Sequence, residues 1–274
     1  MKASLFCRIA EASRREDITA IPISKLAFLA GEAGFSGISM RPSVISVDHT
    51  SEQQNAVRAI LNNNGLSASM VIGNAPLARN NAEAPDCLRK ITPHLDLAER
   101  LGAKLVRIMV QTKSDIQHAQ RAADEAAERR ITLSQKSHWG TLRETVEECI
   151  EVVNLIDRPN FGITFEAANL LACGDDYGPN AIRRLAPHIV NFYIQYVRLN
   201  LDGAHTFHSH HMGSTNLTYV PLEDTSGIPI SPLIEALREI GYDGWVTVHQ
   251  PLRGDQLVED AIDEATRVFL PLVY

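Results

Sequence analysis

Short apolar segments alternate with amphipathic helical segments along the whole chain. The first pairs are SLFCRIA with ISKLAFLAGEAG and GISMRPS with SEQQNAVRAILNNNG. Eight strand-type and eight helix-type segments follow one another in this order as far as DGWVTVHQP and DQLVEDAIDEATRVFL. Strict alternation of this kind favours parallel strands that are joined by helical crossovers. The pattern therefore limits the chain to a parallel α/β architecture.

Among parallel α/β folds, a closed barrel suits this chain best. A (β/α)8 barrel takes roughly 250 residues, so the 274 residues fit a single barrel domain over 1–274. A doubly wound open sheet is the alternative, but it more often carries a glycine-rich phosphate turn after its first strand, and RIAEASRRED is no such turn. We therefore predict the α/β class and a single (β/α)8 TIM barrel.

The charge and the hydrophobicity of the chain limit the kinds of partner that it can bind. The formal net charge of −7, without a basic stripe, argues against nucleic acid. No run of about 20 apolar residues occurs, and MKASLFCRIAEASRRED lacks the pattern of an export signal. We therefore expect no membrane partner, a cytoplasmic location and a small-molecule substrate. The cysteines lie at no zinc-like or redox spacing and fit reduced thiols; they are Cys7, Cys87, Cys149 and Cys173.

Three strands end in side chains that can carry chemistry. The alternation of side chains along a barrel strand decides which ones face inward, and barrel active sites lie where the strands end. ITLSQKSH directs Lys136 and His138 inward, and WVTVHQ directs His249 inward. FGITFEAAN directs Glu166 inward, with Asn169 in the loop beyond. We predict Lys136, Glu166 and His249 as catalytic residues.

Two further strands complete the predicted site. VNFYIQYVR turns Tyr193 and Gln195 inward, and Ser39 and Arg41 share a parity on the second strand. We predict that the substrate-binding residues are Arg41, His138, Asn169 and Gln195.

Each predicted catalytic residue also has a purely structural interpretation. Lys136 could be a solvated charge at the rim, His249 a buried core histidine, and Glu166 the partner of Lys136 in a structural ion pair. Several ionisable groups on one face of adjacent buried strands are costly, however, unless they are paired or used. Their combination therefore favours a site.

Four segments together resemble a known family. NAIRRLAPHI, EALREIGYDGWVTV, LSQKSHWGTL and ITFEAANLL resemble the xylose isomerase-like TIM barrels of sugar isomerases, epimerases and endonucleases of AP endonuclease family 2, with GYDGW as the most specific piece. The resemblance implies a carbohydrate or polyol enzyme, a divalent metal ion held by Glu, Asp, His and Glu from strands five to eight, and proton transfer by the two glutamates. It also implies a homo-oligomer.

The chain departs from that pattern at the metal ligands. The positions of the fifth-strand Glu, the sixth-strand Asp and the last-strand Glu hold Lys136, Glu166 and His249. The position of the seventh-strand His falls on Tyr193 or Gln195, depending on the register. The residues offer about zero net charge where the family offers roughly three negative charges, and an ammonium group repels a dication. We therefore favour no metal ion in the family position.

The replacements can still move protons. Lys136 can stabilise an enolate oxygen by a charge-assisted hydrogen bond. His249 titrates near neutral pH and can accept or donate a proton, while Glu166 holds Lys136 or the imidazole in place.

A histidine-rich loop leaves a second metal site open. GAHTFHSHHMG contains His205, His208, His210 and His211, and clustered imidazoles suit zinc, copper or nickel. We expect this loop to lie over the barrel mouth and to give one or two histidines to substrate binding. A divalent metal ion held by Glu166, His249 and His210 is the alternative.

The sequence thus predicts an isomerase or epimerase, or a lyase, that abstracts a proton next to the carbonyl of a sugar, keto-sugar or polyol acid. Arg41 would then bind a carboxylate or phosphate. The alternative is a catalytically silent barrel that binds a sugar-like ligand or regulates a partner. An endonuclease fits poorly, because the chain is acidic and has lost the metal ligands.

Overall fold

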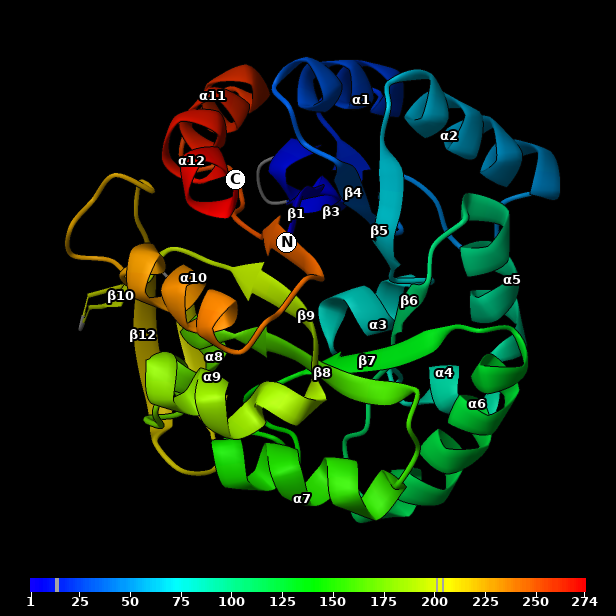
Figure 1. Cartoon of the computed structure of the whole chain (residues 1–274), viewed down its shortest axis with the longest axis vertical. Coiled ribbons are helices and arrows are strands. Elements are labelled where there is room, and N and C mark those ends of the chain that lie inside the picture. Colours follow the sequence, from blue (N-terminus) through cyan, green and yellow to red (C-terminus); the bar gives the residue numbers. More distant parts are fainter. Residues whose placement is uncertain (13–14, 201, 204) are drawn as a thin grey trace.

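The barrel closes from eight parallel strands that lie side by side in chain order (Figure 1). This computed structural model describes residues 1–12, 15–200, 202–203 and 205–274. The strands are β1 (Lys2–Phe6), β4 (Gly37–Met40), β5 (Ser67–Val71), β6 (Leu105–Arg107), β7 (Thr132–Lys136), β8 (Phe161–Glu166), β9 (Ile189–Ile194) and β13 (Trp245–Val248). The predicted (β/α)8 barrel is confirmed.

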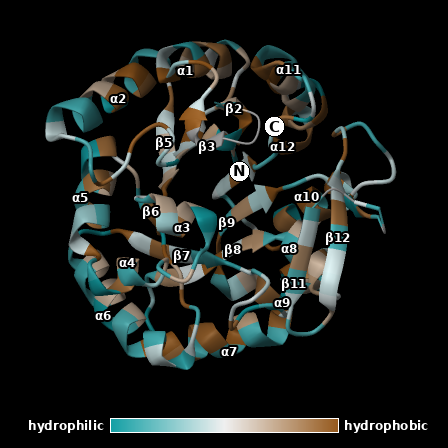
Figure 2. Cartoon of the chain, turned by 180° about the vertical axis from the view of Figure 1, so that it is seen from behind, coloured by the Kyte–Doolittle hydropathy of each residue, from teal (hydrophilic) through white to brown (hydrophobic). Residues whose placement is uncertain are grey.

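Helices form a ring outside the strands (Figure 1). The long ones are α1 (Ile23–Glu32), α2 (Ser51–Asn63), α5 (Thr92–Leu101), α6 (Ile116–Glu128), α7 (Val146–Ile156), α9 (Pro179–Leu185), α10 (Ile230–Glu239) and α11 (Val258–Val268). Their ribbons carry both hydrophilic and hydrophobic stretches (Figure 2), as amphipathic helices on a buried sheet should. None of the helices in the described ranges is long and apolar enough to cross a membrane.

Shorter elements lie between these. They are α3 (Ala75–Arg79), α4 (Asp86–Arg89), α8 (Ala167–Ala172), α12 (Leu270–Val273), the 3-10 helices Cys7–Ala10, Lys113–Asp115 and Ala186–His188, and the strands β2 (Glu11–Ala12) and β3 (Arg15–Thr19). A separate three-stranded sheet contains β10 (Val197–Leu199), β12 (Gly213–Tyr219) and β11 (His205–Ser209).

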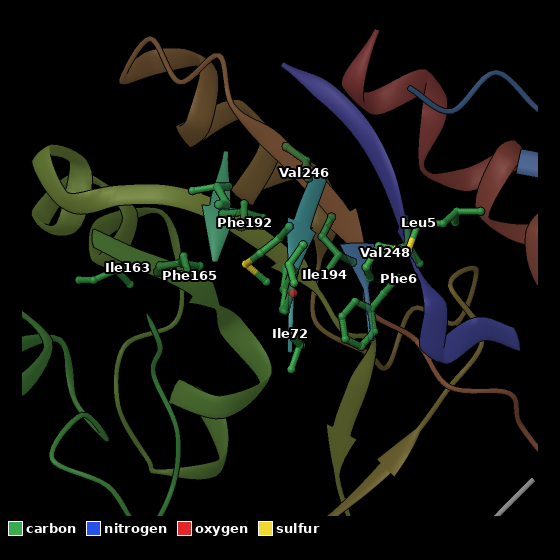
Figure 3. Packing of buried hydrophobic residues seen from close by; sticks show 14 of the residues in the cluster. Leu5, Phe6, Ile72, Ile163, Phe165, Phe192, Ile194, Val246 and Val248 are labelled. Carbon is green, nitrogen blue, oxygen red and sulfur yellow. The ribbon is translucent and has the colours of Figure 1, made fainter. Parts of the chain in front are cut away.

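The main apolar core lies between the strands and the helix ring. Phe165 and Phe192 stack with ring centroids 5.1 Å apart, and Val246 and Val248 pack nearby (Figure 3). These are the side chains that the alternation along β8, β9 and β13 predicts on the outer face. Because that face takes the apolar residues, the polar residues of the same strands point into the barrel.

Inside the barrel, hydroxyl and amide groups bond one another. The Oγ atoms of Ser4 and Ser69 lie 2.7 Å apart, and Ser134 Oγ lies 2.6 Å from Thr164 Oγ1. Asn191 donates to Thr164 Oγ1 over 3.3 Å. Barrel interiors of this fold are usually filled by branched aliphatic side chains. Here paired polar groups fill part of that space, and this pairing offsets much of the cost of burying them.

The segment after the seventh barrel strand differs from the prediction. The strand predicted over VNFYIQYVRL ends at Ile194, and Val197–Leu199 joins the separate sheet instead. The predicted long loop contains a hairpin of β11 and β12, which turns at Gly213 with φ 65°. Leu201 and Ala204 of that loop lie outside the described residues. Strand pairing satisfies the backbone groups that an open loop would leave to water.

Two other boundaries also differ. The predicted strand FGITFEAANLL ends at Glu166, and its last residues form α8, since Ala and Leu favour a helix. The predicted helix PDCLRKITPHLDLAERLG is two helices, α4 and α5, and Pro93 stands in the first turn of the second. Proline suits a first helical turn but not a helix interior.

Candidate active site

A cavity of about 260 Å³ opens at the carboxyl ends of the barrel strands. The predicted residues Arg41, Lys136, His138, Gln195 and His249 all line it. Parity explains this convergence, because apolar neighbours hold the other face of each strand against the helices. The cavity therefore gathers five of the seven residues that the sequence singles out.

Glu166 lies beneath the cavity as a fully buried carboxylate that joins two of these residues. Its Oε2 lies 2.9 Å from Lys136 Nζ, and its Oε1 lies 2.6 Å from His249 Nδ1. Asn169 Nδ2 donates to the same Oε2 over 2.6 Å. Since both oxygens already accept hydrogen bonds, Glu166 is suited to orienting Lys136 and His249 rather than to receiving a substrate proton.

The charge state of this cluster follows from burial and pairing. Burial by itself raises the pKa of Glu166. The Lys136 ammonium and His249 together lower it by more than burial raises it, so the carboxyl stays ionised. Burial lowers the pKa of Lys136 to about 8, against the opposing effect of Glu166. Burial likewise lowers the pKa of His249 to about 3. At neutral pH the cluster holds a carboxylate, an ammonium and a neutral imidazole.

The neutral imidazole of His249 has a defined orientation. Because an ionised carboxylate only accepts, Nδ1 carries the proton that it donates to Glu166, and Nε2 keeps the free lone pair. Phe6 meets the ring edge-on at 4.3 Å between centroids, and Tyr193 packs at 4.7 Å. The ring is thus held from two sides with a basic nitrogen available.

The register of β9 places Tyr193 at the level of the cluster. Tyr193 pairs with Glu166 on β8 and with Thr247 on β13. Its hydroxyl lies 3.3 Å from Ser39 Oγ across the barrel, and burial raises its pKa. Gln195 lies just after the strand and donates to the Tyr219 hydroxyl over 3.2 Å. Tyr193 therefore belongs to the buried layer and Gln195 to the cavity wall.

His138 brings a second imidazole to the cavity. Its Nδ1 lies 2.8 Å from the Trp139 carbonyl oxygen, which fixes the proton on that nitrogen. Its Nε2 is buried and has no hydrogen-bond partner among the described residues. Burial and the nearby Lys136 hold its pKa well below the usual range. His138 is thus a neutral acceptor in the cavity wall.

Asn169 does not line the cavity. It is 1% exposed and lies behind Glu166, where its Nδ2 also donates to the Ser137 carbonyl over 2.7 Å. The predicted contact of Asn169 with substrate therefore has no counterpart in the structure. Its visible connection is to the Glu166 carboxylate.

The four histidines of the predicted loop lie in different surroundings and do not form one cluster. His205 lines the cavity and meets Tyr219 edge-on, whereas His208 bonds Ser214, and His211 Nε2 lies 3.0 Å from Glu148. The backbone N–H of His210 donates to Glu144. Within the described ranges, no three His, Cys, Asp or Glu side chains are placed to hold a metal ion. The alternative of Glu166, His249 and His210 as a metal site is therefore not formed.

The structure adds Arg8, Arg107, Trp139 and Tyr219 to the cavity wall, which the sequence reasoning missed. The position of Arg107 in the cavity could have been predicted from the sequence. It stands between the apolar Val106 and Ile108 and is the last residue of β6, so alternation along the strand turns it inward when its apolar neighbours face the helices. Arg8 lies in the 3-10 helix Cys7–Ala10 and not in a strand, and Tyr219 ends a hairpin strand in a segment that the sequence predicts as a loop.

Comparisons with known proteins agree with this architecture. Residues 28–270 match the family of xylose isomerase-like TIM barrels. An inosose dehydratase of Lacticaseibacillus casei is 26% identical over 131 residues, which are 47% of this chain and 43% of that protein. The chain thus spans less than half the length of this curated relative.

Solved structures of similar shape extend over nearly the whole chain. The probable 3-DHS dehydratase AsbF of Bacillus anthracis has a TM-score of 0.73 and 18% identity, with 98% of both chains covered. A D-psicose 3-epimerase of Clostridium cellulolyticum has a TM-score of 0.69 and 15% identity, with 100% of this chain and 99% of the other covered. At such identities the likeness shows the fold alone.

A metal ion does occur among these neighbours. A xylose isomerase-like TIM barrel protein of Mycobacterium smegmatis, solved with magnesium, has a TM-score of 0.67 and 16% identity, covering 100% of this chain and 97% of the other. The donor set here does not fit such an ion. The Lys136 ammonium lies against Glu166, and hydrogen bonds occupy both carboxylate oxygens.

Proposed function

The chain belongs to the family of xylose isomerase-like TIM barrels, and from that premise we propose that it is an enzyme that abstracts a proton next to the carbonyl of a small carbohydrate-like substrate. The reaction class is isomerisation, epimerisation or dehydration. The observation that carries the proposal is the pair of contacts from Glu166 to Lys136 and His249 at 2.9 and 2.6 Å.

We also propose that the protein is located in the cytoplasm. Its cysteines are buried and form no disulfide bonds among the described residues, which suits a reducing compartment.

His249 is the base in this proposal. Its Nε2 takes the carbon-bound proton, while Nδ1 remains hydrogen-bonded to Glu166. The carboxylate stabilises the imidazolium that forms, because the positive charge develops next to a fixed negative charge. The same imidazolium then returns the proton to carbon in an epimerisation or isomerisation, or to a leaving hydroxyl in a dehydration.

Lys136 supplies the positive charge for the developing enolate. One of its three ammonium protons is directed at Glu166, and the side chain also lines the cavity. A substrate carbonyl oxygen that accepts one of the other protons gains a charge-assisted hydrogen bond, which strengthens as the oxygen becomes anionic. His138 Nε2, a neutral acceptor, suits a substrate hydroxyl. Gln195 and Arg41 line the remaining wall and complete the proposed binding residues.

Proton exchange tests the proposal. Keto-sugars and keto-polyol acids are incubated with the protein in deuterated water, and the loss of the carbon-bound proton is followed by NMR. We expect exchange that is unchanged by a chelator and falls by about 10²–10⁴-fold in His249→Ala, the usual range for a general base. His118→Ala is the matched control, since His118 lies on α6 and does not line the cavity.

A catalytically silent barrel is the second candidate. The replacement of the family's metal-binding glutamate by Lys136 favours it, because metal-dependent chemistry is then lost. Absence of exchange with every substrate, together with unchanged ligand binding by His249→Ala, would support the silent barrel. Loss of exchange on adding a chelator would instead contradict the proton transfer without metal that the donor set suggests.

A further inference from the structure

Five cationic side chains line the cavity. They are Arg8, Arg41, Arg79, Arg107 and Lys136. No acidic side chain lines it among the residues that the structure describes. This contrasts with the net charge of −7 for the whole chain. A cationic cleft in an acidic protein attracts anions and repels cations.

Among these side chains, Arg107 gives the strongest indication of an anion-binding site. It is 4% exposed, and no carboxylate lies within ion-pair distance of it in the described ranges. Its Nη2 donates to Asn80 Oδ1, a neutral acceptor, and its Nε has no hydrogen-bond partner there. A buried guanidinium without a negative partner is expensive unless a ligand supplies one.

Arg41 approaches the same space from β4. Its Nη1 lies 2.9 Å from Glu11 Oε2, and its guanidinium lies over the Phe6 ring at 5.8 Å. These contacts fix its position. Arg41 and Arg107 line the same cavity. Burial lowers the pKa of Arg107, Tyr193 and Glu166 oppose this, and the charge of Arg41 lowers it further. Two guanidinium groups that repel each other are stabilised together by one anion between them.

The strand register relates this pair to the proposed catalytic residues. Arg107 pairs with Ser134 on β7, two residues before Lys136. Arg107 and Lys136 therefore lie on neighbouring strands, and both line the same cavity. The cavity, about 260 Å³, suits a molecule the size of a monosaccharide or a cyclic polyol acid.

We propose that Arg107 and Arg41 form an anion-binding subsite, and that the substrate carries a carboxylate or phosphate group there. The identity of this group as part of a substrate rests on the proposed function, whereas the binding of the anion does not. The subsite gives the buried Arg107 its missing negative partner and fixes the substrate relative to Lys136 and His249.

Calorimetric titration tests this subsite with D-gluconate, inorganic phosphate and neutral sorbitol at constant ionic strength. We expect one or both anions to bind at least tenfold more tightly than sorbitol. Tighter binding of gluconate than of phosphate identifies a carboxylate site, and the reverse order identifies a phosphate site. Anions that bind no more tightly than sorbitol overturn the proposal.

Arg107→Met removes the charge but keeps much of the side-chain volume. We expect it to weaken anion binding at least tenfold, and its Tm without anions to equal or exceed that of the unmodified protein. Arg107→Lys, which keeps the charge and loses the planar fork, should bind several-fold more weakly. Arg129→Met is the control, because Arg129 pairs with Asp96 and Glu99 outside the cavity. Unchanged anion binding by both Arg107 variants contradicts the subsite.

The test of the anion subsite can fail or succeed independently of the test of the proposed reaction. Anion binding and proton exchange are measured on the same unmodified protein, so each result is obtained independently of the other. Anion binding without proton exchange on any substrate leaves the subsite standing and removes the proposed reaction. Proton exchange with neutral keto-sugars, without tighter binding of anions than of sorbitol, supports the proposed reaction and removes the subsite.

Discussion

At the scale of single residues, the candidate site depends on one buried carboxylate. Glu166 accepts from Lys136, His249 and Asn169 at once. This arrangement sets the tautomer of the imidazole and holds the ammonium without leaving the carboxylate open to substrate. In the proposed mechanism Asn169 would act through Glu166, as a positioning residue.

The pKa values of the site predict the pH dependence of kcat/KM. Burial keeps His249 neutral far below pH 6.5, since its pKa is lowered to about 3. Burial also lowers the pKa of Lys136 to about 8, so its positive charge is lost above that pH. We expect a bell-shaped profile with the acid limb below pH 6.5 and the alkaline limb near pH 8. An alkaline limb that stays in place in Lys136→Met would contradict the assignment to Lys136.

Substrate binding should move the acid limb. The charges of Lys136 and Arg8 contribute to the low pKa of His249, after the larger effect of burial. An anionic substrate offsets these charges and makes the imidazole more basic. We therefore expect the acid limb of kcat, which reports the complex, to lie at higher pH than that of kcat/KM, which reports the free enzyme. Coincident limbs would show that the bound substrate leaves these charges uncompensated.

At the scale of elements, the hairpin of β11 and β12 decides what covers the cavity. Figures 1 and 2 show its sheet beside α8, outside the barrel strands. It brings His205, Phe207 and Tyr219 to the cavity wall, and Phe207 packs on Trp139 with ring centroids 4.0 Å apart. In the proposed reaction, an aromatic pair at this edge would help to exclude water from the substrate.

Truncating this contact should weaken substrate binding but leave the barrel intact. Loss of about 40 Å² of apolar contact with the substrate costs about 1 kcal/mol, so Phe207→Ala should raise KM about fivefold. The Tm should fall by only a few degrees, because Phe207 packs on Trp139 at the edge of the core and not within it. Leu199→Ala on β10 of the same sheet is the control, since Leu199 is 53% exposed and does not line the cavity. Equal effects of the two variants on KM would argue against a role of Phe207 in covering the cavity.

At the scale of the whole molecule, buried neutral histidines link stability to pH. His94 on α5 is 3% exposed, and its Nδ1 has no hydrogen-bond partner among the described residues. Burial lowers its pKa from 6.5 to about 4. Between these values the unfolded chain binds a proton that the folded chain does not, so stability falls as the pH falls.

His94→Leu should reduce this acid sensitivity. One proton over this window corresponds to roughly 3 kcal/mol at about 1.4 kcal/mol per pH unit. We expect the loss of unfolding free energy between pH 7 and pH 4 to be smaller in the variant by up to that amount. Urea denaturation at both pH values measures it. An identical loss in both proteins would mean that His94 is protonated in the folded state.

Alternation and parity in the sequence determined the fold class, the inward direction of the catalytic candidates and the cavity positions of Arg41, His138 and Gln195. These follow from local physics, because a strand buried against helices must turn its apolar side chains outward and its polar ones inward. The same rule could have identified Arg107.

Only the tertiary structure decided how the groups pair. It placed Glu166 between Lys136 and His249, moved Asn169 behind the carboxylate, and separated His210 from the site. It also decided the register of β9, which brings Tyr193 level with Glu166. Distances between side chains on different strands depend on barrel closure and strand register, and hydrophobic periodicity within a strand carries no information about either.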